Sequence, residues 1–444
     1  MDPSTFLPSF GGVAFTLVAF VVALSVIVAV HEYGHYIVGR WTGIHAEVFS
    51  LGFGPVLVSR TDRRGTRWQV AALPFGGFVR FLGDANAASV GGRPVSERDR
   101  RRTMLGAPLW ARAATVAAGP VANFILAVLV FAGVLLWEGR PSDPLTVASV
   151  RPLPPAFAQG LQPGDRILAI DGRAVPAPAP GGGLDLPEVA SAAAVPYRVL
   201  RDGEEVTVEG PHPFAPIVDR VSPDGAAWDV EMRAGDVILS IDGTPVRAFS
   251  EMVGIVEASE GRPLLFEAWR DGQALEFTVV PRRTDLPAEG GGFETSWKVG
   301  LGGGLAFAVE TVTPSPGAAL ADAARQLGFV LSSSLQGMWS MVTGAISTCN
   351  LSGPVGIAEA SGAMASQGPA SFLWFLAVLS AAVGLMNLFP IPVLDGGHLV
   401  FHAWEALTGR PPGERALRAL VSIGLTAILA LTVFAVANDL ILCP

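Results

Sequence analysis

The sequence predicts a polytopic α-helical membrane protein with about four transmembrane helices, a membrane-associated cytoplasmic β region and two external mixed α/β domains. Three observations lead to this class. Hydrophobic residues make up 50% of the 444 residues and charged residues only 16%, whereas a soluble domain carries about 25% charged residues. Four apolar stretches are long enough to cross a hydrocarbon layer of about 30 Å as helices. The long segment between the second and third stretches contains an internal repeat.

The apolar stretches run over Gly12–Val38, Ala113–Trp137, Phe372–Phe389 and Ala419–Ala437. The first lacks the basic residues that begin a secretory signal peptide, so we expect it to remain in the mature protein. The corresponding segments are 1–44 for the first helix, 113–138 for the second, 369–409 for the third with its cytoplasmic end, and 410–444 for the fourth.

Arginine placement predicts the orientation in the membrane. No Lys or Arg precedes Arg40, whereas the segment from Arg40 to Arg112 is rich in arginine. Because cytoplasmic loops carry the excess of Lys and Arg, that segment is expected in the cytoplasm. Alternation then places both termini, and the segment between the second and third helices, on the opposite side.

The cytoplasmic segment 45–112 is expected to form a β-rich loop and a linker. It contains "GFGPVLVSR" and "TRWQVAALPFGGFVRF", which are runs rich in β-branched and aromatic residues bounded by Gly and Pro. Such runs are typical of strands and turns. Around Gly91–Gly92 the sequence becomes polar, which indicates a flexible stretch.

The external segment repeats itself. "LQPGDRILAIDG" (Leu161–Gly172) matches "MRAGDVILSIDG" (Met232–Gly243) 71 residues later, and an "RDG" turn follows in each copy. The repeat resembles two tandem PDZ domains at 145–211 and 217–281, a fold that binds an extended peptide at a sheet edge. A duplicated spacer without a ligand is the alternative. The rest of the external segment, 282–368, is expected to be a linker with an amphipathic helix rather than a fifth span, because charged and serine residues interrupt it.

"HEYGH" in the first apolar stretch has the H-E-x-x-H pattern. Residues four apart share one face of a helix, so His31 and His35 can hold one Zn²⁺, with Glu32 as the base for its bound water. Two packed histidines are the alternative, but ionisable residues in an apolar span are costly unless they have a function.

A catalytic zinc takes three protein ligands and a water, so a third ligand must come from elsewhere. Asp395 in "NLFPIPVLDGGH" is the preferred candidate, because it lies at the cytoplasmic end of the third stretch, as the two histidines do in the first. His398 is the competing ligand. The remaining histidines, His45, His212 and His402, have no spaced partner and are expected to be structural or exposed.

"HEYGH" together with "NLFPIPVLDGG" resembles the site-2 protease family of intramembrane zinc metalloproteases, and in particular the bacterial regulator-of-sigma-E protease type. "AAGPVANF" (Ala117–Phe124), "LSGPVGIAEA" (Leu351–Ala360) and the tandem repeats add to this resemblance, which covers nearly the whole chain. The resemblance implies that His31, His35 and Asp395 are zinc ligands, that Glu32 is the catalytic acid and base, and that Asn387 holds the substrate backbone. It also implies that the cytoplasmic β region presents the substrate as an extended strand.

The family resemblance further implies an endopeptidase that cuts the transmembrane segments of single-span membrane proteins. Substrates of this type are anti-sigma factors already shortened by another protease, and remnant signal peptides are a second class. The expected location is the bacterial cytoplasmic (inner) membrane, with the PDZ-like domains and both termini periplasmic and the active site near the cytoplasmic face.

Two alternatives are a non-proteolytic scaffold with PDZ peptide binding and a structural metal, and a transporter. A structural zinc would take four protein ligands and would not need Glu32, and the paired broken helices of a transporter are absent from the sequence pattern. The net charge of −9 without a basic face predicts no nucleic-acid partner. Cys349 and Cys443 are too few for a disulfide framework.

Overall fold

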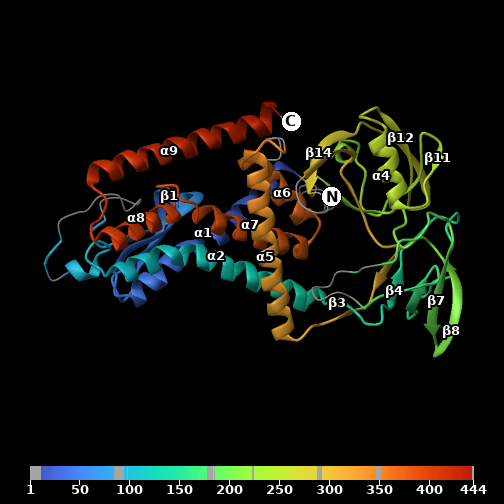
Figure 1. Cartoon of the computed structure of the whole chain (residues 1–444), viewed down its shortest axis with the longest axis horizontal. Coiled ribbons are helices and arrows are strands. Elements are labelled where there is room, and N and C mark those ends of the chain that lie inside the picture. Colours follow the sequence, from blue (N-terminus) through green and yellow to red (C-terminus); the bar gives the residue numbers. More distant parts are fainter. Residues whose placement is uncertain are drawn as a thin grey trace, which may run out of the picture. The chain divides into compact units, whose positions relative to one another are not determined.

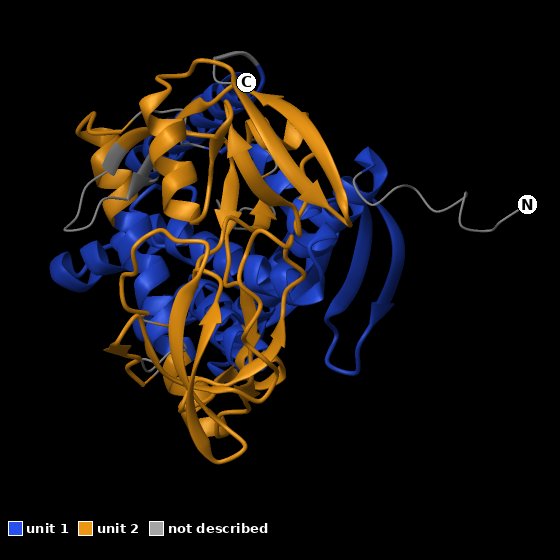
Figure 2. Cartoon of the chain, turned by 90° about the vertical axis from the view of Figure 1, so that its right-hand side faces the viewer, with its two compact units in different colours: residues 1–134, 323–335, 351–444 blue, residues 135–322, 336–350 orange. Residues whose placement is uncertain are grey.

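The computed structural model describes residues 12–84, 95–97, 99–177, 184, 186–222, 225–287, 293–346 and 352–442. The polar stretch at Gly91–Gly92 and both cysteines lie outside these residues. The helices and strands are shown in Figure 1. The chain divides into two compact units (Figure 2): unit 1 contains Met1–Val134, Ala323–Leu335 and Leu351–Pro444, and unit 2 contains Leu135–Asp322 and Gln336–Asn350.

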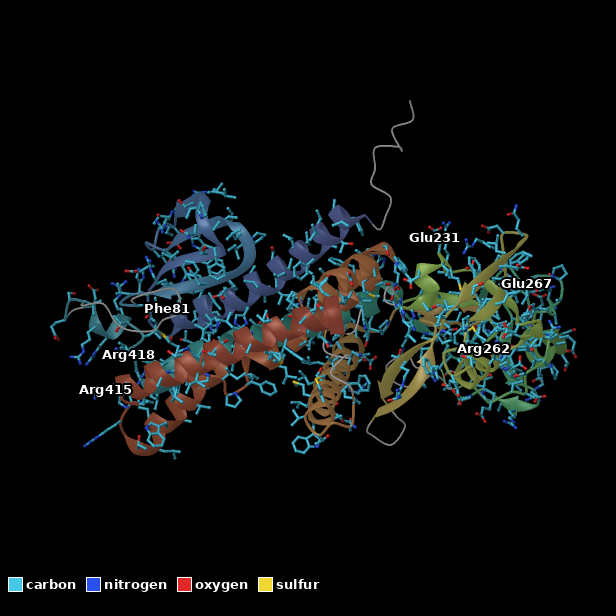
Figure 3. All side chains as sticks on the ribbon, turned by 90° about the horizontal axis from the view of Figure 1, so that it is seen from above. Phe81, Glu231, Arg262, Glu267, Arg415 and Arg418 are labelled. Atoms are coloured by element: carbon cyan, nitrogen blue, oxygen red, sulfur yellow. The ribbon has the colours of Figure 1, made fainter. Side chains whose placement is uncertain are left out.

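Four helices in the described part of the chain are long and apolar enough to cross a membrane. They are α1 (Val13–Trp41), α2 (Leu109–Glu138), α7 (Pro369–Asn387) and α9 (Glu414–Ala437). These helices confirm the four predicted spans and extend the second by several residues at its start. Arg415 and Arg418 lie in the first turns of α9 (Figure 3).

Unit 1 also contains helices α6 (Pro354–Ser366) and α8 (Asp395–Thr408), which the sequence analysis did not separate from their neighbours. Helix α6 packs on α1, α7 and α9. Asp439, in the turn Asn438–Leu442 after α9, accepts hydrogen bonds from the backbone N–H groups of Gly353, Val355 and Gly356 at 2.8, 3.2 and 3.1 Å. A carboxylate at a helix N-terminus satisfies unpaired donors and favours the helix dipole. Helix α8 (Asp395–Thr408) follows α7 after a short link.

The predicted β region is a folded hairpin of β1 (Ala46–Thr61) and β2 (Arg67–Phe81). Each residue of Val48–Leu51 is paired twice, once with Gly77–Arg80 and once with Arg67–Val70. The second half of β1 then pairs with Arg67–Val70 from the other side. The hairpin is therefore four ribbons wide, with Gly77–Phe81 at one edge and Val58–Thr61 at the other. Its core packs against α1, where Tyr36, Phe49, Val79 and Phe81 are buried.

Unit 2 contains two sheets of the same topology, one for each copy of the repeat. The first has the order β6-β5-β7-β8 and the second β11-β10-β12-β13. Their strands are β5 (Arg166–Ile170), β6 (Arg173–Ala174), β7 (Val195–Arg201) and β8 (Glu204–Gly210), then β10 (Val237–Ile241), β11 (Thr244–Pro245), β12 (Leu264–Arg270) and β13 (Gln273–Val279). Helix α4 (Phe249–Ala258) belongs to the second copy.

Four Asp-Gly pairs make the hairpin turns of the two sheets. Each pair has positive φ at both residues, for example 51° at Asp202 and 87° at Gly203. This is the type I′ turn, which matches the twist of antiparallel strands and favours Asp-Gly. The repeated "IDG" and "RDG" strings of the sequence are therefore turn residues.

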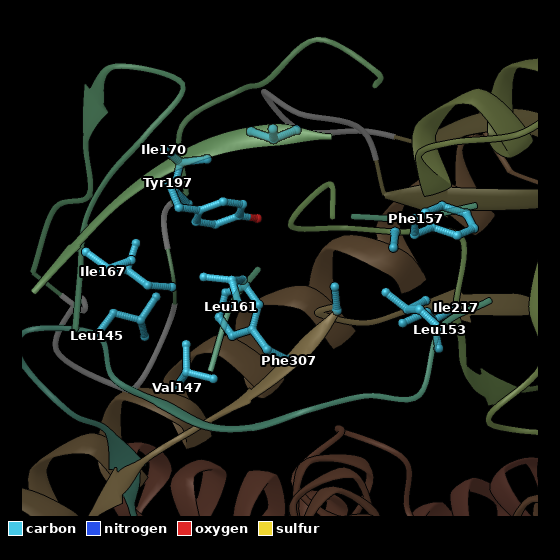
Figure 4. Close-up of a cluster of buried hydrophobic side chains, with 14 of the residues drawn as sticks. Leu145, Val147, Leu153, Phe157, Leu161, Ile167, Ile170, Tyr197, Ile217 and Phe307 are labelled. Atoms are coloured by element: carbon cyan, nitrogen blue, oxygen red, sulfur yellow. The ribbon is translucent and has the colours of Figure 1, made fainter. Parts of the chain in front are cut away.

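Each four-stranded sheet, with the elements packed around it, forms one lobe of unit 2. Segments that lie beyond the predicted domain boundaries add a strand to each lobe. Strand β17 (Phe307–Val309) pairs with β4 (Val147–Val150), and Phe307 is buried in the core around β5 and β7 (Figure 4). Strand β16 (Leu301–Gly303) pairs with β9 (Val218–Val221). The chain thus leaves the first lobe, forms the second, and returns to the first.

The remaining elements link these parts. They are the short helix α3 (Ala226–Asp229), the pairs β3 (Arg140–Pro141) with β18 (Thr311–Val312) and β14 (Arg282–Pro287) with β15 (Phe293–Lys298), the 3-10 turn Arg100–Arg102, and α5 (Pro316–Val342). Helix α5 lies within residues 282–368, the segment in which an amphipathic helix was expected, and Ser315 caps its start.

Candidate metal centre

His31 and His35 lie one turn apart on α1, as the motif spacing predicts. Their Nε2 atoms are 3.2 Å apart, and both side chains are nearly buried. At 3.6 residues per turn, positions i and i+4 lie on the same helix face, so both imidazoles point to the same place.

Asp395 joins them from α8. Its Oδ2 lies 3.1 Å from Nε2 of His31 and 3.4 Å from Nε2 of His35. In the part of the chain that the structure describes, these three residues form the group whose ligand atoms lie within 4.8 Å of one another. Residues 364 positions apart in the sequence therefore meet at one point.

The glycines that follow Asp395 allow this placement. A Cβ atom on Gly396 would collide with the carbonyl oxygens of Leu388 and Phe389, and one on Gly397 with that of Ile391. The first turn of α8 therefore packs directly on the backbone of the link from α7. Only glycine permits an approach this close, which explains the "LDGG" string.

The hydrogen bonds of the two Nδ1 atoms determine whether the Nε2 atoms are free to bind a metal, because a neutral imidazole has a proton on one nitrogen and a lone pair on the other. Nδ1 of His35 lies 2.8 Å from the carbonyl oxygen of Thr115, which can only accept, so Nδ1 carries the proton and Nε2 keeps its lone pair. Nδ1 of His31 lies 3.3 Å from the Asn123 amide. Asn123 is fully buried, and in this orientation of its amide the Oδ1 atom has no hydrogen-bond partner among the described residues.

If the Asn123 amide is turned by 180°, which its shape permits because the amide N and O are nearly identical in size, Oδ1 accepts the Nδ1 proton of His31. In that arrangement the Nε2 atoms of both histidines present lone pairs toward the carboxylate oxygen of Asp395. This donor set fits a Zn²⁺ ion, which takes neutral imidazole and carboxylate ligands whose other atoms are fixed by hydrogen bonds.

Asp395 is the acidic member of the group, and its Oδ2 is buried without a hydrogen-bond donor among the described residues. A carboxylate in this place supplies the negative charge that a cation requires.

Close contact between α1 and α2 is needed to bring Asn123 and Thr115 to the imidazoles. A Cβ on Gly119 of α2 would overlap the ring of His35, and one on Gly34 of α1 would overlap the Ala118 carbonyl. The string "AAGPVANF" thus supplies both a glycine for the approach and an asparagine for His31.

A pocket of about 240 Å³ opens beside the three ligand atoms. Glu32, Asn387 and His398 line it, together with Gly77–Val79 and Phe81 of the sheet. The side chain of Asn387 donates from Nδ2 to the carbonyl oxygen of Val383 at 3.0 Å. His398 lines the pocket but is not in the group of converging ligand atoms, and burial lowers the pKa of its imidazole.

An ion pair holds the far half of α8. Arg112 of α2 donates to both carboxylate oxygens of Glu405, at 3.0 and 2.6 Å. Next to it, burial and the Arg112 charge lower the pKa of His402 to about 4. The sequence reasoning did not identify Asn123, Thr115 or this pair. A polar residue inside an apolar span was the available signal for Asn123, whereas Thr115 acts through its backbone and leaves no signal.

Comparison with known proteins agrees with this centre. The model of peptidase family M50 matches residues 19–431. A protein of Agrobacterium fabrum whose name assigns it to the zinc metalloproteases is 36% identical, over 98% of each chain. A similarly named protein of Rhizobium meliloti is 37% identical over 96% of each chain. The regulator of sigma-E protease of Salmonella typhimurium is 32% identical over 96% of this chain and 98% of its own.

The match to the family model spans most of the chain, and the relatives cover it almost end to end. The chain therefore belongs to peptidase family M50, the site-2 proteases, and is a membrane zinc metalloprotease.

Proposed function

We propose that this chain is an endopeptidase that cuts single-span membrane proteins within their transmembrane segments, and that His31, His35 and Asp395 are its zinc ligands. The observation that carries the proposal is the convergence of these three ligand atoms, from a helix able to span the membrane and from α8. When bound, zinc supplies a Lewis acid and a water whose pKa is lowered to about 7.

Glu32 is the proposed acid and base. It follows His31 on α1 and lines the pocket beside the ligand atoms, and its side chain packs against Gly77 of the sheet edge. From there its carboxylate can take a proton from the attacking water and return it to the leaving amine. A metal that only stabilised the fold would have no use for a carboxylate in this pocket.

The sheet edge Gly77–Phe81 is the proposed partner of the substrate backbone. These residues form an outer ribbon of the β1–β2 hairpin, and four of them line the pocket with Glu32. A peptide bond within a helix is shielded by its own hydrogen bonds, so cleavage requires local unwinding. An added strand at this edge would pair the N–H and C=O groups that unwinding frees.

Asn387 is the proposed second support for the substrate. It lies at the last position of α7 and lines the same pocket. Only one hydrogen bond of its amide is to the protein in the described structure, from Nδ2 to Val383. The amide oxygen and the second N–H are thus suited to bind a substrate peptide group.

The proposed substrates are of the anti-sigma factor type, shortened beforehand by another protease, with remnant signal peptides as a second class. The support comes from relatives of the regulator of sigma-E protease type, one of which is 32% identical over nearly its whole length. We propose that the enzyme lies in the bacterial inner membrane with the arginine-rich β region in the cytoplasm and both termini and unit 2 in the periplasm, as the positive-inside rule predicts.

We also propose that the two lobes of unit 2 are PDZ-like domains that control which membrane proteins reach the metal. Their support is the shared sheet order, the shared Asp-Gly turns and the matching pairs that the returning chain makes, β17 with β4 in the first lobe and β16 with β9 in the second. Limiting the size of the external part of a substrate and binding its new carboxyl terminus are both open to such domains.

The test replaces Glu32 by Gln, which keeps the shape of the side chain and removes the base. Purified protein is reconstituted with a single-span reporter, and cleavage and zinc content are both measured. We expect zinc to stay bound while cleavage falls by at least about 100-fold, the lower limit for losing general acid-base catalysis. Glu205→Gln, an exposed carboxylate of unit 2, is the matched control and should leave both unchanged. Full cleavage by the Glu32→Gln protein would refute the proposal.

A further inference from the structure

The β1–β2 sheet is wider than the part of α1 that it covers. On the face toward α1, Phe49 and Val79 are buried. Register places Val70 and Val58 on the same face, because Leu51 pairs with Val70 and Val70 with Val58. Yet Val70 is 47% exposed and Val58 68% exposed. The ribbons near Val58 therefore overhang α1.

A pocket of about 530 Å³ lies under this overhang. Its other wall is formed by Ala29, Val30 and Tyr33 of α1, on a different side of the helix from the metal ligands. Pockets of about 300–1,000 Å³ are typical of small-molecule sites. This pocket does not include any of the proposed catalytic residues.

The lining selects the kind of molecule that fits. Nearly all of it is apolar. Its polar groups are the guanidinium of Arg60, the Tyr33 phenol, the Gln69 amide and the Trp68 indole, whose N–H donates to Asp62. A peptide placed here would leave most of its N–H and C=O groups without partners, which is costly away from water. A hydrocarbon chain has no such groups.

Positive charge surrounds one end of the pocket. Arg60 lines it, and three more exposed arginines follow nearby in the chain: Arg63 and Arg64 in the turn that joins β1 to β2, and Arg67 at the start of β2. The one acidic residue of this turn, Asp62, accepts hydrogen bonds from the N–H groups of Arg64 and Thr66 and from the Trp68 indole. Four arginines and this one aspartate give residues 60–67 a net charge of +3.

The depth of the pocket suits a lipid. Helix α1 is a membrane-spanning candidate that ends at Trp41. At 1.5 Å per residue, Ala29 to Tyr33 lie about 12–18 Å before that end, at the level of acyl chains. Long arginine side chains reach from such depths toward the headgroups.

We propose that this pocket binds an acyl chain of an anionic phospholipid, with the lipid phosphate held by Arg60 and the neighbouring turn arginines. The site is separate from the metal centre and does not depend on the proposed substrate. The bound lipid would fill the space between α1 and the sheet and hold the overhanging ribbons in place.

The test uses the full-length protein in nanodiscs containing phosphatidylglycerol or phosphatidylcholine with a photoreactive group on the acyl chain. Cross-linked residues are located by mass spectrometry. We expect labelling of the segments around Val58, Val70 and Tyr33 by phosphatidylglycerol, about five-fold above phosphatidylcholine. Five-fold corresponds to about 1 kcal/mol, the contribution of one arginine near an anionic surface.

Three variants sharpen the result. Arg60→Gln should remove the preference for phosphatidylglycerol, whereas Arg198→Gln, an exposed arginine of unit 2, should keep it. Val58→Trp should fill the pocket and abolish labelling. Leu57→Trp is its matched control, because Leu57 is equally exposed on the same ribbon but does not line the pocket. Unchanged zinc content verifies that each variant is folded.

Equal labelling by the two lipids, or labelling that survives Val58→Trp, would overturn the proposal. Displacement of the lipid label by a single-span reporter that cross-links to Val58 itself would also overturn it, because the pocket would then be a substrate site.

Discussion

Unit 1 and unit 2 each bury aspartates, and they balance the buried charge in different ways. In unit 2, Asp165 and Asp236 are almost fully buried, and each receives two hydrogen bonds from an arginine of its own repeat. Arg201 binds Asp165 at 2.7 and 2.8 Å, and Arg270 binds Asp236 at 2.6 and 2.7 Å. Within the described ranges of unit 1, the carboxylate oxygen of Asp395 faces no guanidinium but the Nε2 atoms of His31 and His35, at 3.1 and 3.4 Å.

We propose that this difference separates a structural carboxylate from a metal ligand. A guanidinium brings its own protons and charge, so the two pairs in unit 2 are complete within the chain. Three hydrogen-bond acceptor atoms that meet at one buried point have no partner for their lone pairs unless a cation binds between them. The repeat also explains the sequence: Gly-Asp and the Arg of "RDG" recur because they are the two partners of one ion pair.

Asp395→Ala tests this comparison with the largest expected effect. Two imidazoles then remain, fewer than the three protein ligands of a catalytic zinc. We expect zinc affinity to fall by more than about 100-fold, since even changes that only misorient a ligand cost about 10- to 100-fold. Cleavage of a single-span reporter should be lost with the metal. Zinc content by elemental mass spectrometry measures the effect, and an unchanged content would show that Asp395 is not a ligand.

Asp165→Ala is the counterpart in unit 2. It leaves the guanidinium of Arg201 without its partner, and breaking a buried pair in this way costs about 3–5 kcal/mol. Because the Arg201 side chain is 25% exposed, we expect a loss in the free energy of unfolding near the lower end, about 3 kcal/mol. Hydrogen exchange of β5 and β7 in the full chain measures it. Zinc content should not change.

A double replacement, Asp165→Leu with Arg201→Leu, is the control for this loss. Removing both partners leaves no unpaired charge, so most of the lost free energy should return. A double variant as unstable as Asp165→Ala would show that packing at this position, and not the ion pair, sets the stability.

Asn123→Ala has a smaller effect on the metal centre. It removes the group that fixes Nδ1 of His31, and we expect zinc affinity to fall about 10- to 100-fold. Asn123→Asp keeps an acceptor for the Nδ1 proton and should restore most of the affinity. Competition with a zinc chelator measures both. If the two variants behaved alike, Asn123 would act only through packing.

The sequence predicted the four spans and the two segments that meet at the candidate metal centre, because these depend on local patterns. An apolar run long enough to cross a membrane, an i,i+4 histidine pair and a "LDGG" string each carry their structural consequence within a few residues. The prediction that "HEYGH" and "LDGG" lie at the same depth in the membrane required only the direction in which each of the two helices crosses it. The Asp-Gly strings of the repeat likewise encode their turns locally.

Features that depend on distant partners were missed. Helix α6 depends on Asp439, some 80 residues away, for its N-terminal hydrogen bonds. The return of Phe307 to the core of the first lobe is a long-range pairing with no local pattern. The repeats also diverge: α4 occupies Phe249–Ala258, whereas the corresponding stretch of the first copy contains Pro187 and no helix in its described residues.

Acid unfolding of unit 2 gives the smallest expected effect and completes the comparison. Burial works to raise the pKa of the Asp165 carboxyl, but hydrogen bonds from Arg201 and from the N–H of Gln162 outweigh it and hold the pKa below its ordinary value. A carboxyl with a lowered pKa in the folded state stabilises the protein above its unfolded pKa of about 3.9. Below that value the unfolded chain binds the proton more readily than the folded one.

We therefore expect the free energy of unfolding of unit 2 to be constant from pH 6 to about 5 with respect to this group, and to fall as the pH drops through about 4 and below. Urea unfolding followed by circular dichroism at successive pH values measures the slope. Asp165→Asn has no proton to bind at this position, so its slope should be shallower than that of the native chain. An equal slope in the two proteins would show that Asp165 is not the titrating group, because removing its carboxyl would then have left proton uptake on unfolding unchanged.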